Sequence, residues 1–186
     1  KFKWLEYHKW KVTAEWFSPV YDKLVFRAAA KIGILGTWNK DIGTIPFERF
    51  ELGGDGISNF AGIQGKDIIA LRGYDVLDLR ANVENNQGGA AAYNKFTLEL
   101  RYPISLNPMS TVYVLGFFEG GNSWNDLRKY NPLDLNRAAG LGLRVFLPMF
   151  GTLGFDYGVG FDKNLGPDAG LTEYGKFNII LGFEPE

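Results

Sequence analysis

The sequence contains no cysteine and a single histidine, His8. Without cysteine the chain can form neither a disulfide framework nor a zinc site with thiolate ligands. A lone histidine also excludes histidine clusters as metal sites and most histidine-based catalysis. We therefore expect no cofactor and no bound metal, and we interpret His8, which lies in an aromatic stretch, as a packing residue.

Two further absences narrow the class of protein. The 20 lysines and arginines are balanced by 21 aspartates and glutamates, so the basic excess of a general nucleic-acid binder is missing. No apolar run approaches the ~20 residues of a transmembrane helix. Aromatic residues, in contrast, make up 16% of the chain, which also has 24 glycines. This combination is typical of a β-barrel in a membrane.

Seven segments alternate apolar and polar residues with the period of a β-strand. In the first of them, Trp10, Val12 and Trp16 lie on one face, while Lys11 and Glu15 lie on the other. The opposite faces of the later segments are rich in glycine and charged residues. The predicted strands cover about residues 8–17, 23–35, 95–104, 111–121, 137–147, 152–162 and 174–183.

The length of the apolar stripes favours a membrane barrel over a soluble sandwich. About five large side chains at alternating positions span ~10 residues, and a tilted strand of ~9–11 residues crosses a bilayer. Short turns alternate with long loops, of which 45–91 is the longest, as they do in outer-membrane barrels. We predict an all-β, antiparallel transmembrane barrel whose polar faces line a watery interior.

The number of strands raises a question, because bacterial single-chain barrels have an even number of strands, eight or more. Seven strands should therefore not close alone. Either one strand escapes the pattern, or the first part of the barrel is absent from this chain. The chain begins inside a patterned segment, "KFKWLEYHKW", which favours the second explanation.

The longest loop carries two motifs, "IPFERFELGGDG" at 45–56 and "LRGY" at 71–74. In this order they resemble the BamA family, the central barrel subunits of the outer-membrane β-barrel assembly machinery. "GFFEGGNSW", which ends at Trp124, also resembles a strand of that family. The resemblance covers nearly the whole chain and identifies it with the last seven strands of a sixteen-stranded barrel. The matching loop residues are Pro46, Phe47, Glu48, Phe50, Gly53, Gly54, Leu71, Arg72, Gly73 and Tyr74.

The resemblance implies a specific role for the second motif. In this family the long extracellular loop folds back into the barrel, and its arginine reaches acids on the inner wall. Arg72 would then pair with Glu119, and Asp156 is a second candidate. Arginine suits this role because its planar fork binds a carboxylate at two points. Gly73 would allow close passage or a positive φ, and Tyr74 would supply a large anchor with a polar tip.

The resemblance also implies a function without covalent chemistry. Family members fold and insert nascent outer-membrane β-barrel proteins at a weak lateral seam beside the last strand, with accessory lipoproteins, in contact with lipid and lipopolysaccharide of the Gram-negative outer membrane. Glycine weakens strand pairing, and an unpaired strand edge is a template for another strand. The seam residues on the predicted last strand are Phe177, Ile179, Leu181, Gly182 and Phe183.

Three other readings remain open from the sequence. A two-partner-secretion or other translocation barrel would share the arginine loop motif. A passive porin would have a constriction loop, but no acidic ring opposes a basic ring here. An enzyme could use paired carboxylates such as Glu99, Glu119, Asp156 and Asp162, but these are spread over three strands with no nucleophile, so we expect no enzymatic activity.

Overall fold

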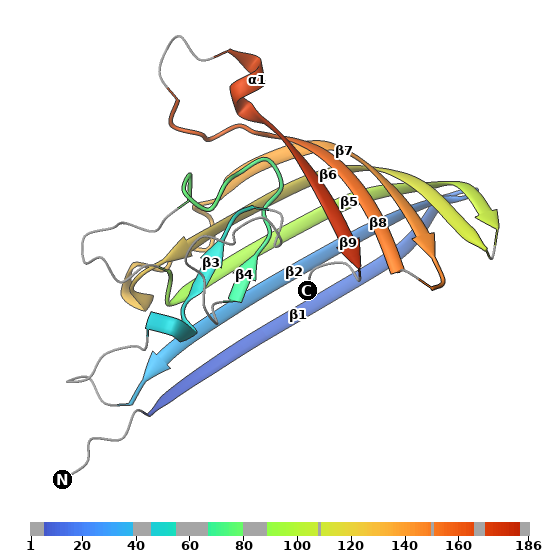
Figure 1. Ribbon diagram of the computed structural model, residues 1–186. Coiled ribbons are helices and arrows are strands. Elements are labelled where there is room, and N and C mark those ends of the chain that lie inside the picture. Colours follow the sequence, from blue (N-terminus) through green and yellow to red (C-terminus); the bar gives the residue numbers. More distant parts are fainter. Residues whose placement is uncertain are drawn as a thin grey trace.

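The computed structural model describes residues 6–38, 46–54, 67–79, 89–107, 109–149, 151–165 and 170–182. Its main element is one antiparallel sheet of seven strands that curves into an arc (Figure 1). The predicted all-β fold is confirmed, and the sheet is part of a β-barrel. In sheet order, which is also chain order, the strands are β1 (Tyr7–Tyr21), β2 (Leu24–Thr37), β5 (Ala92–Asn107), β6 (Ser110–Trp124), β7 (Asn136–Leu147), β8 (Gly151–Gly160) and β9 (Gly175–Gly182).

The strands differ from the predicted ones mainly at their ends. Most are longer than the apolar stripe that revealed them, because hydrogen-bonded pairing continues past the apolar residues into the turns. The pairing of β5 with β6 shifts between Pro103 and Ser105, where proline offers no N–H to the ladder. At the last strand the prediction was too long, since Tyr174 belongs to the short helix α1 (Leu171–Tyr174). Phe183 lies outside the described residues.

The long loop has regular structure of its own, which the sequence pattern did not reveal. A 3₁₀ turn, η1 (Pro46–Glu48), leads into β3 (Phe50–Leu52), and β3 pairs in parallel with β4 (Asp67–Ile69). A second 3₁₀ turn, η2 (Leu127–Lys129), lies between β6 and β7. Each loop strand has three residues, which is too short for a period-two pattern to be recognised.

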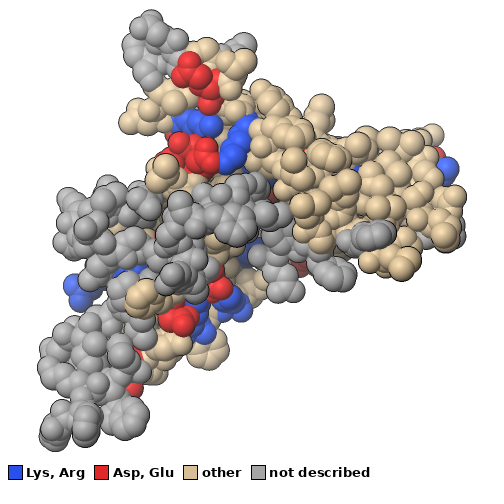
Figure 2. All heavy atoms as spheres, viewed as in Figure 1, with Lys and Arg blue, Asp and Glu red and all other residues tan. Residues whose placement is uncertain are grey.

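The outer, convex face of the sheet is apolar and exposed. Trp10, Trp16 and Leu141 have 67%, 62% and 72% of their surface exposed, which a water-soluble fold would bury. Figure 2 shows the part of the strands distant from the loop as almost free of charged residues, whereas lysines, arginines and acids gather near the loop. No helix in the described part of the chain is long and apolar enough to cross a membrane.

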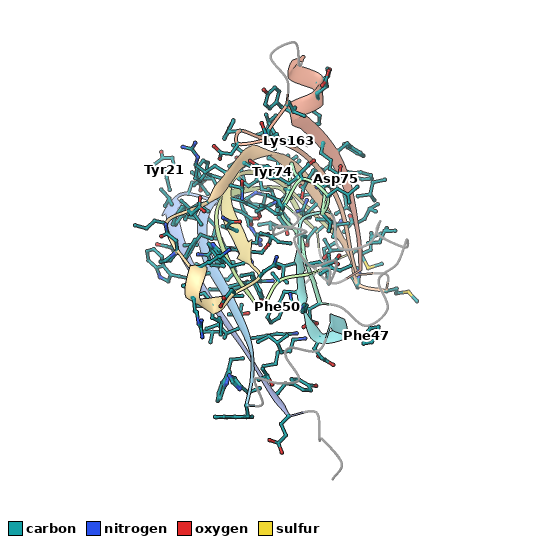
Figure 3. All side chains as sticks on the ribbon, turned by 90° about the vertical axis from the view of Figure 1, so that its left-hand side faces the viewer. Tyr21, Phe47, Phe50, Tyr74, Asp75 and Lys163 are labelled. Atoms are coloured by element: carbon teal, nitrogen blue, oxygen red, sulfur yellow. The ribbon has the colours of Figure 1, made fainter. Side chains whose placement is uncertain are left out.

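The inner, concave face is polar and is covered by the loop. β3 and β4 lie within the arc of the sheet (Figure 1), and Figure 3 shows Phe50, Tyr74 and Asp75 on its inner side. The loop brings its own apolar core, which packs against three wall residues. This core consists of Phe50, Leu52, Ile69, Leu71, Tyr74 and Leu79 from the loop, with Leu35, Tyr93 and Ala138 from the strands.

Candidate functional site

Arg72 lies at the centre of the candidate site and contacts three carboxylates. Its Nη2 donates to Glu119 Oε1 at 2.6 Å and to Glu99 Oε1 at 2.7 Å. Its Nε and its backbone N–H both donate to Glu119, each at 3.0 Å. Asp156 Oδ2 is 3.5 Å from Nη1, and the guanidinium lies 3.7 Å from the centre of the Phe117 ring. The structure therefore brings together Arg72, Glu119 and Asp156 as the resemblance implies, and it adds Glu99.

Each of the three carboxylates is shared with further cations of the wall. Arg101 and Arg27 hold Glu99 at 2.6 and 3.2 Å, and Lys95 holds Glu119 at 3.0 Å. Arg144 binds Asp156 with two parallel hydrogen bonds of 2.6 and 2.7 Å. The wall thus forms a charged network into which Arg72 fits. Such a network favours one position of the loop, because a buried charge that loses its partners is costly.

Glycines on the wall allow the loop backbone to lie directly against β8. A Cβ on Gly158 would lie 2.9 Å from the backbone nitrogen of Gly73 and 3.2 Å from the carbonyl carbon of Arg72. A Cβ on Gly160 would lie 2.8 Å from the Tyr74 ring. Gly73 itself has φ +88°, a conformation that favours glycine. The alternating pattern of residues 152–162 places these glycines on the inner face, but it does not indicate their role against the loop.

Tyr74 fixes the loop to the ends of two strands. Its ring is almost fully buried, and its hydroxyl donates to the carbonyl oxygen of Arg137 at 2.8 Å. The same hydroxyl accepts from the backbone N–H of Asp162 at 2.9 Å. Tyr74 is therefore an anchor with a polar tip that has both of its hydrogen bonds satisfied.

The first loop motif supports the second one directly. Gly53 and Gly54 have φ values of +116° and +74°, and their N–H groups donate to the carbonyl oxygens of Ile69 and Tyr74, both at 2.8 Å. Phe50 is fully buried and meets Tyr93 edge-on at 4.8 Å between ring centres. The backbone of the first motif thus binds the backbone of the second, through the hydrogen bond from Gly54 to Tyr74.

Other members of the first motif have different environments. Glu48 pairs with Lys9 of β1 at 3.0 Å. Phe47 has 62% of its surface exposed, so it does not belong to the loop core. Pro46 begins η1.

Phe183 lies outside the described residues; the other predicted seam residues lie on β9. Phe177, Ile179 and Leu181 point outward and are 58%, 44% and 62% exposed. Gly182 ends the strand with φ +98°. Across the described residues β9 pairs with β8 alone, and β1 pairs with β2 alone. The sheet therefore has two edges, and β9 is the shorter edge strand.

The wall beside Arg72 encloses a cavity of about 60 Å³. Asn178, on the inner face of β9, lines it and is 1% exposed, with no hydrogen-bond partner for either side-chain atom in the described structure. Among the described residues, no group of three or more His, Cys, Asp or Glu side chains is arranged to hold a metal ion.

Asp67 connects the loop to β1 and should make this connection sensitive to acid. Partial burial raises the pKa of its carboxyl, but the ion pairs with Lys11 and Lys9, at 2.7 and 2.6 Å, outweigh burial and hold that pKa below its ordinary value. A carboxyl with a lowered pKa stabilises the folded state above its unfolded pKa of about 3.9, and the stabilisation disappears as the pH falls through the folded value.

We therefore expect wild-type protein to melt higher than an Asp67→Asn variant from pH 5 to 8, and the two melting temperatures to converge below about pH 4. The melting temperatures can be followed by tryptophan fluorescence. Glu48, which shares Lys9 with Asp67, stays in both proteins. A difference that persists undiminished at pH 3 would contradict the role given to the Asp67 carboxylate.

Sequence comparison places these features in a known family. The Omp85 superfamily domain matches residues 2–184. The chain belongs to the Omp85 superfamily. Omp85 proteins are β-barrels of outer-membrane type and include assembly factors such as BamA as well as secretion and translocation barrels. No curated protein matches the chain in such a comparison.

Membership of the Omp85 superfamily fits the two faces of the sheet. The exposed apolar stripe faces lipid in such a barrel, and the inner face with its charged network faces the lumen. Within the membrane all backbone groups must be paired inside the protein, which the long antiparallel ladders of β5, β6 and β7 provide.

Proposed function

We propose that this chain forms the last strands of a barrel that folds other β-barrel proteins and inserts them into the outer membrane of a Gram-negative bacterium. The observation that supports this function best is that the sheet ends in a short edge strand, β9, and that the nearby loop is held firmly at the inner wall. An edge strand offers unpaired N–H and C=O groups on which an incoming strand can form.

The properties of β9 suit a seam that opens and closes. The strand has 8 residues, compared with 16 in β5, so fewer hydrogen bonds hold β9 against β8 than hold β5 against β6. It begins at Gly175 and ends at Gly182, and glycine lowers the stability of strand pairing. Such a strand can exchange one partner for another at low cost. The proposed partners are nascent outer-membrane β-barrel proteins, accessory lipoproteins of the assembly complex, and outer-membrane lipid and lipopolysaccharide.

The proposed mechanism uses no covalent step. The buried carboxylates Glu99, Glu119 and Asp156 are each held in ion pairs with at least two cations. A general acid or base needs a proton that it can exchange with a substrate. The network is better suited to hold the loop than to catalyse a reaction.

A second candidate is a barrel that secretes or translocates polypeptides, in which the loop would leave the lumen to open a path. The charged inner face around Arg72 favours it over a passive pore, because an aqueous channel of charged groups suits an extended polar chain. In that case β9 would stay paired while the loop moves. The two functions therefore differ in which element is mobile.

The proposed function predicts that liposomes carrying the intact parent protein speed the folding of a urea-unfolded outer-membrane barrel at least several-fold. The folded fraction can be measured by its heat-modifiable migration in gels. Liposomes carrying an unrelated porin control for membrane defects around any barrel. Ion conductance or polypeptide release without faster folding would instead support the translocation barrel.

A further inference from the structure

The loop connects the two edge strands of the sheet across its concave face. At one end, Lys9 of β1 pairs with Glu48 and Asp67 at 3.0 and 2.6 Å, and Lys11 pairs with Asp67 at 2.7 Å. At the other end, the carboxylate of Asp75 binds the ammonium of Lys176 on β9. β1 and β9 have no common neighbour in the sheet. The loop thus binds both edge strands, β1 and β9.

The loop is held with unequal strength along its length. Its centre is fixed by Arg72, which is 6% exposed and contacts three carboxylates. Among the residues that the structure describes, the β1 end has three ion pairs. The β9 end has one among the same residues, and the Asp75 side chain in it is 53% exposed. Exposed single pairs are weak and are screened by salt, whereas buried networks are screened much less.

Asp75 is nevertheless held in place from the loop side. The preceding residue, Tyr74, is anchored by two hydrogen bonds to β7 and to the end of β8. The backbone N–H of Asp75 donates to Asp78 Oδ2 at 2.8 Å. Figure 3 shows Tyr74 and Asp75 together inside the arc, close to Lys163. We therefore expect that, when the contact breaks, β9 moves and the loop stays in place.

We propose that Asp75 is a positioning residue for the last strand: its contact with Lys176 holds the first half of β9 against β8, and that half can be released while Arg72 stays bound in its network. The loop is then bound firmly to β1 and to the wall, and its contact with β9 can be released. What the release accomplishes rests on the proposed function; the restraint itself does not.

Hydrogen exchange of the full parent protein in lipid tests the restraint directly. An Asp75→Asn variant should exchange the peptide that covers residues 171–178 about twofold to fivefold faster than wild type, which is the range for a weak ion pair. The peptide that covers residues 138–147 of β7, which pairs with β6 and β8 and not with β9, should stay unchanged. High salt should accelerate exchange of 171–178 in wild type and add nothing in the variant.

Two further variants separate this contact from general loosening. Reversing both charges, in a variant with Asp75→Lys and Lys176→Asp, should return exchange of 171–178 toward wild type. Asp134→Asn, a matched change in the loop between β6 and β7 that pairs with Asn122, should have no effect on 171–178. Unchanged exchange in Asp75→Asn, or an equal rise in β7 and β9, would overturn the proposal.

The folding assay with liposomes distinguishes the restraint from the proposed function. If Asp75→Asn loosens β9 and changes the rate at which a client barrel folds, the contact of Asp75 with Lys176 controls the seam. If β9 loosens and the folding rate stays at the wild-type value, the restraint on β9 is supported and the proposed assembly function at this seam is contradicted.

Discussion

Replacing Arg72 with glutamate should sharply reduce assembly of outer-membrane barrels, because the new carboxylate would face Glu99, Glu119 and Asp156. Removing one partner of a buried ion pair costs about 3–5 kcal/mol, and like charges add to this. The loop should leave the wall, and folded, heat-modifiable barrels in cells should decrease accordingly. Arg72→Lys should give an intermediate loss, since a single ammonium cannot replace the fork that contacts two carboxylates at once.

Charge reversal at Glu119 should restore only part of the activity of Arg72→Glu. Glu119→Arg would supply a cation, but Glu99 and Asp156 would still repel the introduced carboxylate, and Lys95 would lose its own partner. Arg128→Glu is a matched control, because Arg128 is an exposed residue of η2 outside the Arg72 network. Arg72→Glu with wild-type levels of folded barrels would show that the loop contact is dispensable.

The strands and their two faces could be predicted from the sequence because a strand repeats every two residues. A stripe such as Trp10, Val12 and Trp16 is enough to assign an outer face. The charged residues between them are then assigned to the inner face. The ends could not be predicted in this way. β1 continues through Pro19 and Val20 to Tyr21, where alternation is lost but hydrogen bonding to β2 persists.

The contact of Arg72 with Glu119 was available from the resemblance, but its contact with Glu99 was not. The alternating pattern shows which acids lie on the inner face, but it does not show which of them lie within reach of Arg72. The choice among them depends on strand register, which pairs Thr97 with Glu119 and so brings Glu99 to the adjacent position of the same face. That register includes the shift between Pro103 and Ser105, which the alternation of apolar and polar residues does not reveal.

The strands within the loop could not be predicted from the sequence, for a related reason. β3 and β4 are separated by fourteen residues and pair in parallel over three positions each. Their partners are set by the fit of the loop against Leu35 and Tyr93 rather than by local preference. Packing of this kind depends on residues distant in sequence, and propensity carries no information about it.

The wall glycines lead to the second prediction of large effect, for Gly158→Val. The first side-chain carbon at this position would lie 2.9 Å from the backbone nitrogen of Gly73, and backbone cannot rotate away as a side chain can. Overpacking of this kind costs about 1–3 kcal/mol, and the displaced loop would also lose the contacts of Arg72. We expect trypsin to cleave after Arg72 much faster than in wild type, and assembly to fall as in Arg72→Glu.

Valine is intrinsically a better strand residue than glycine, so a loss in Gly158→Val cannot be attributed to a weaker β8. Gly116→Val provides the matched control: its Cβ would meet only Leu141 Cδ2, at 3.8 Å, on the outer face. That variant should keep wild-type protection of the Arg72–Gly73 bond. Equal protection in both variants would mean that the loop does not need to lie against β8, and the close passage of Gly73 along the wall would then be incidental to how the loop is held.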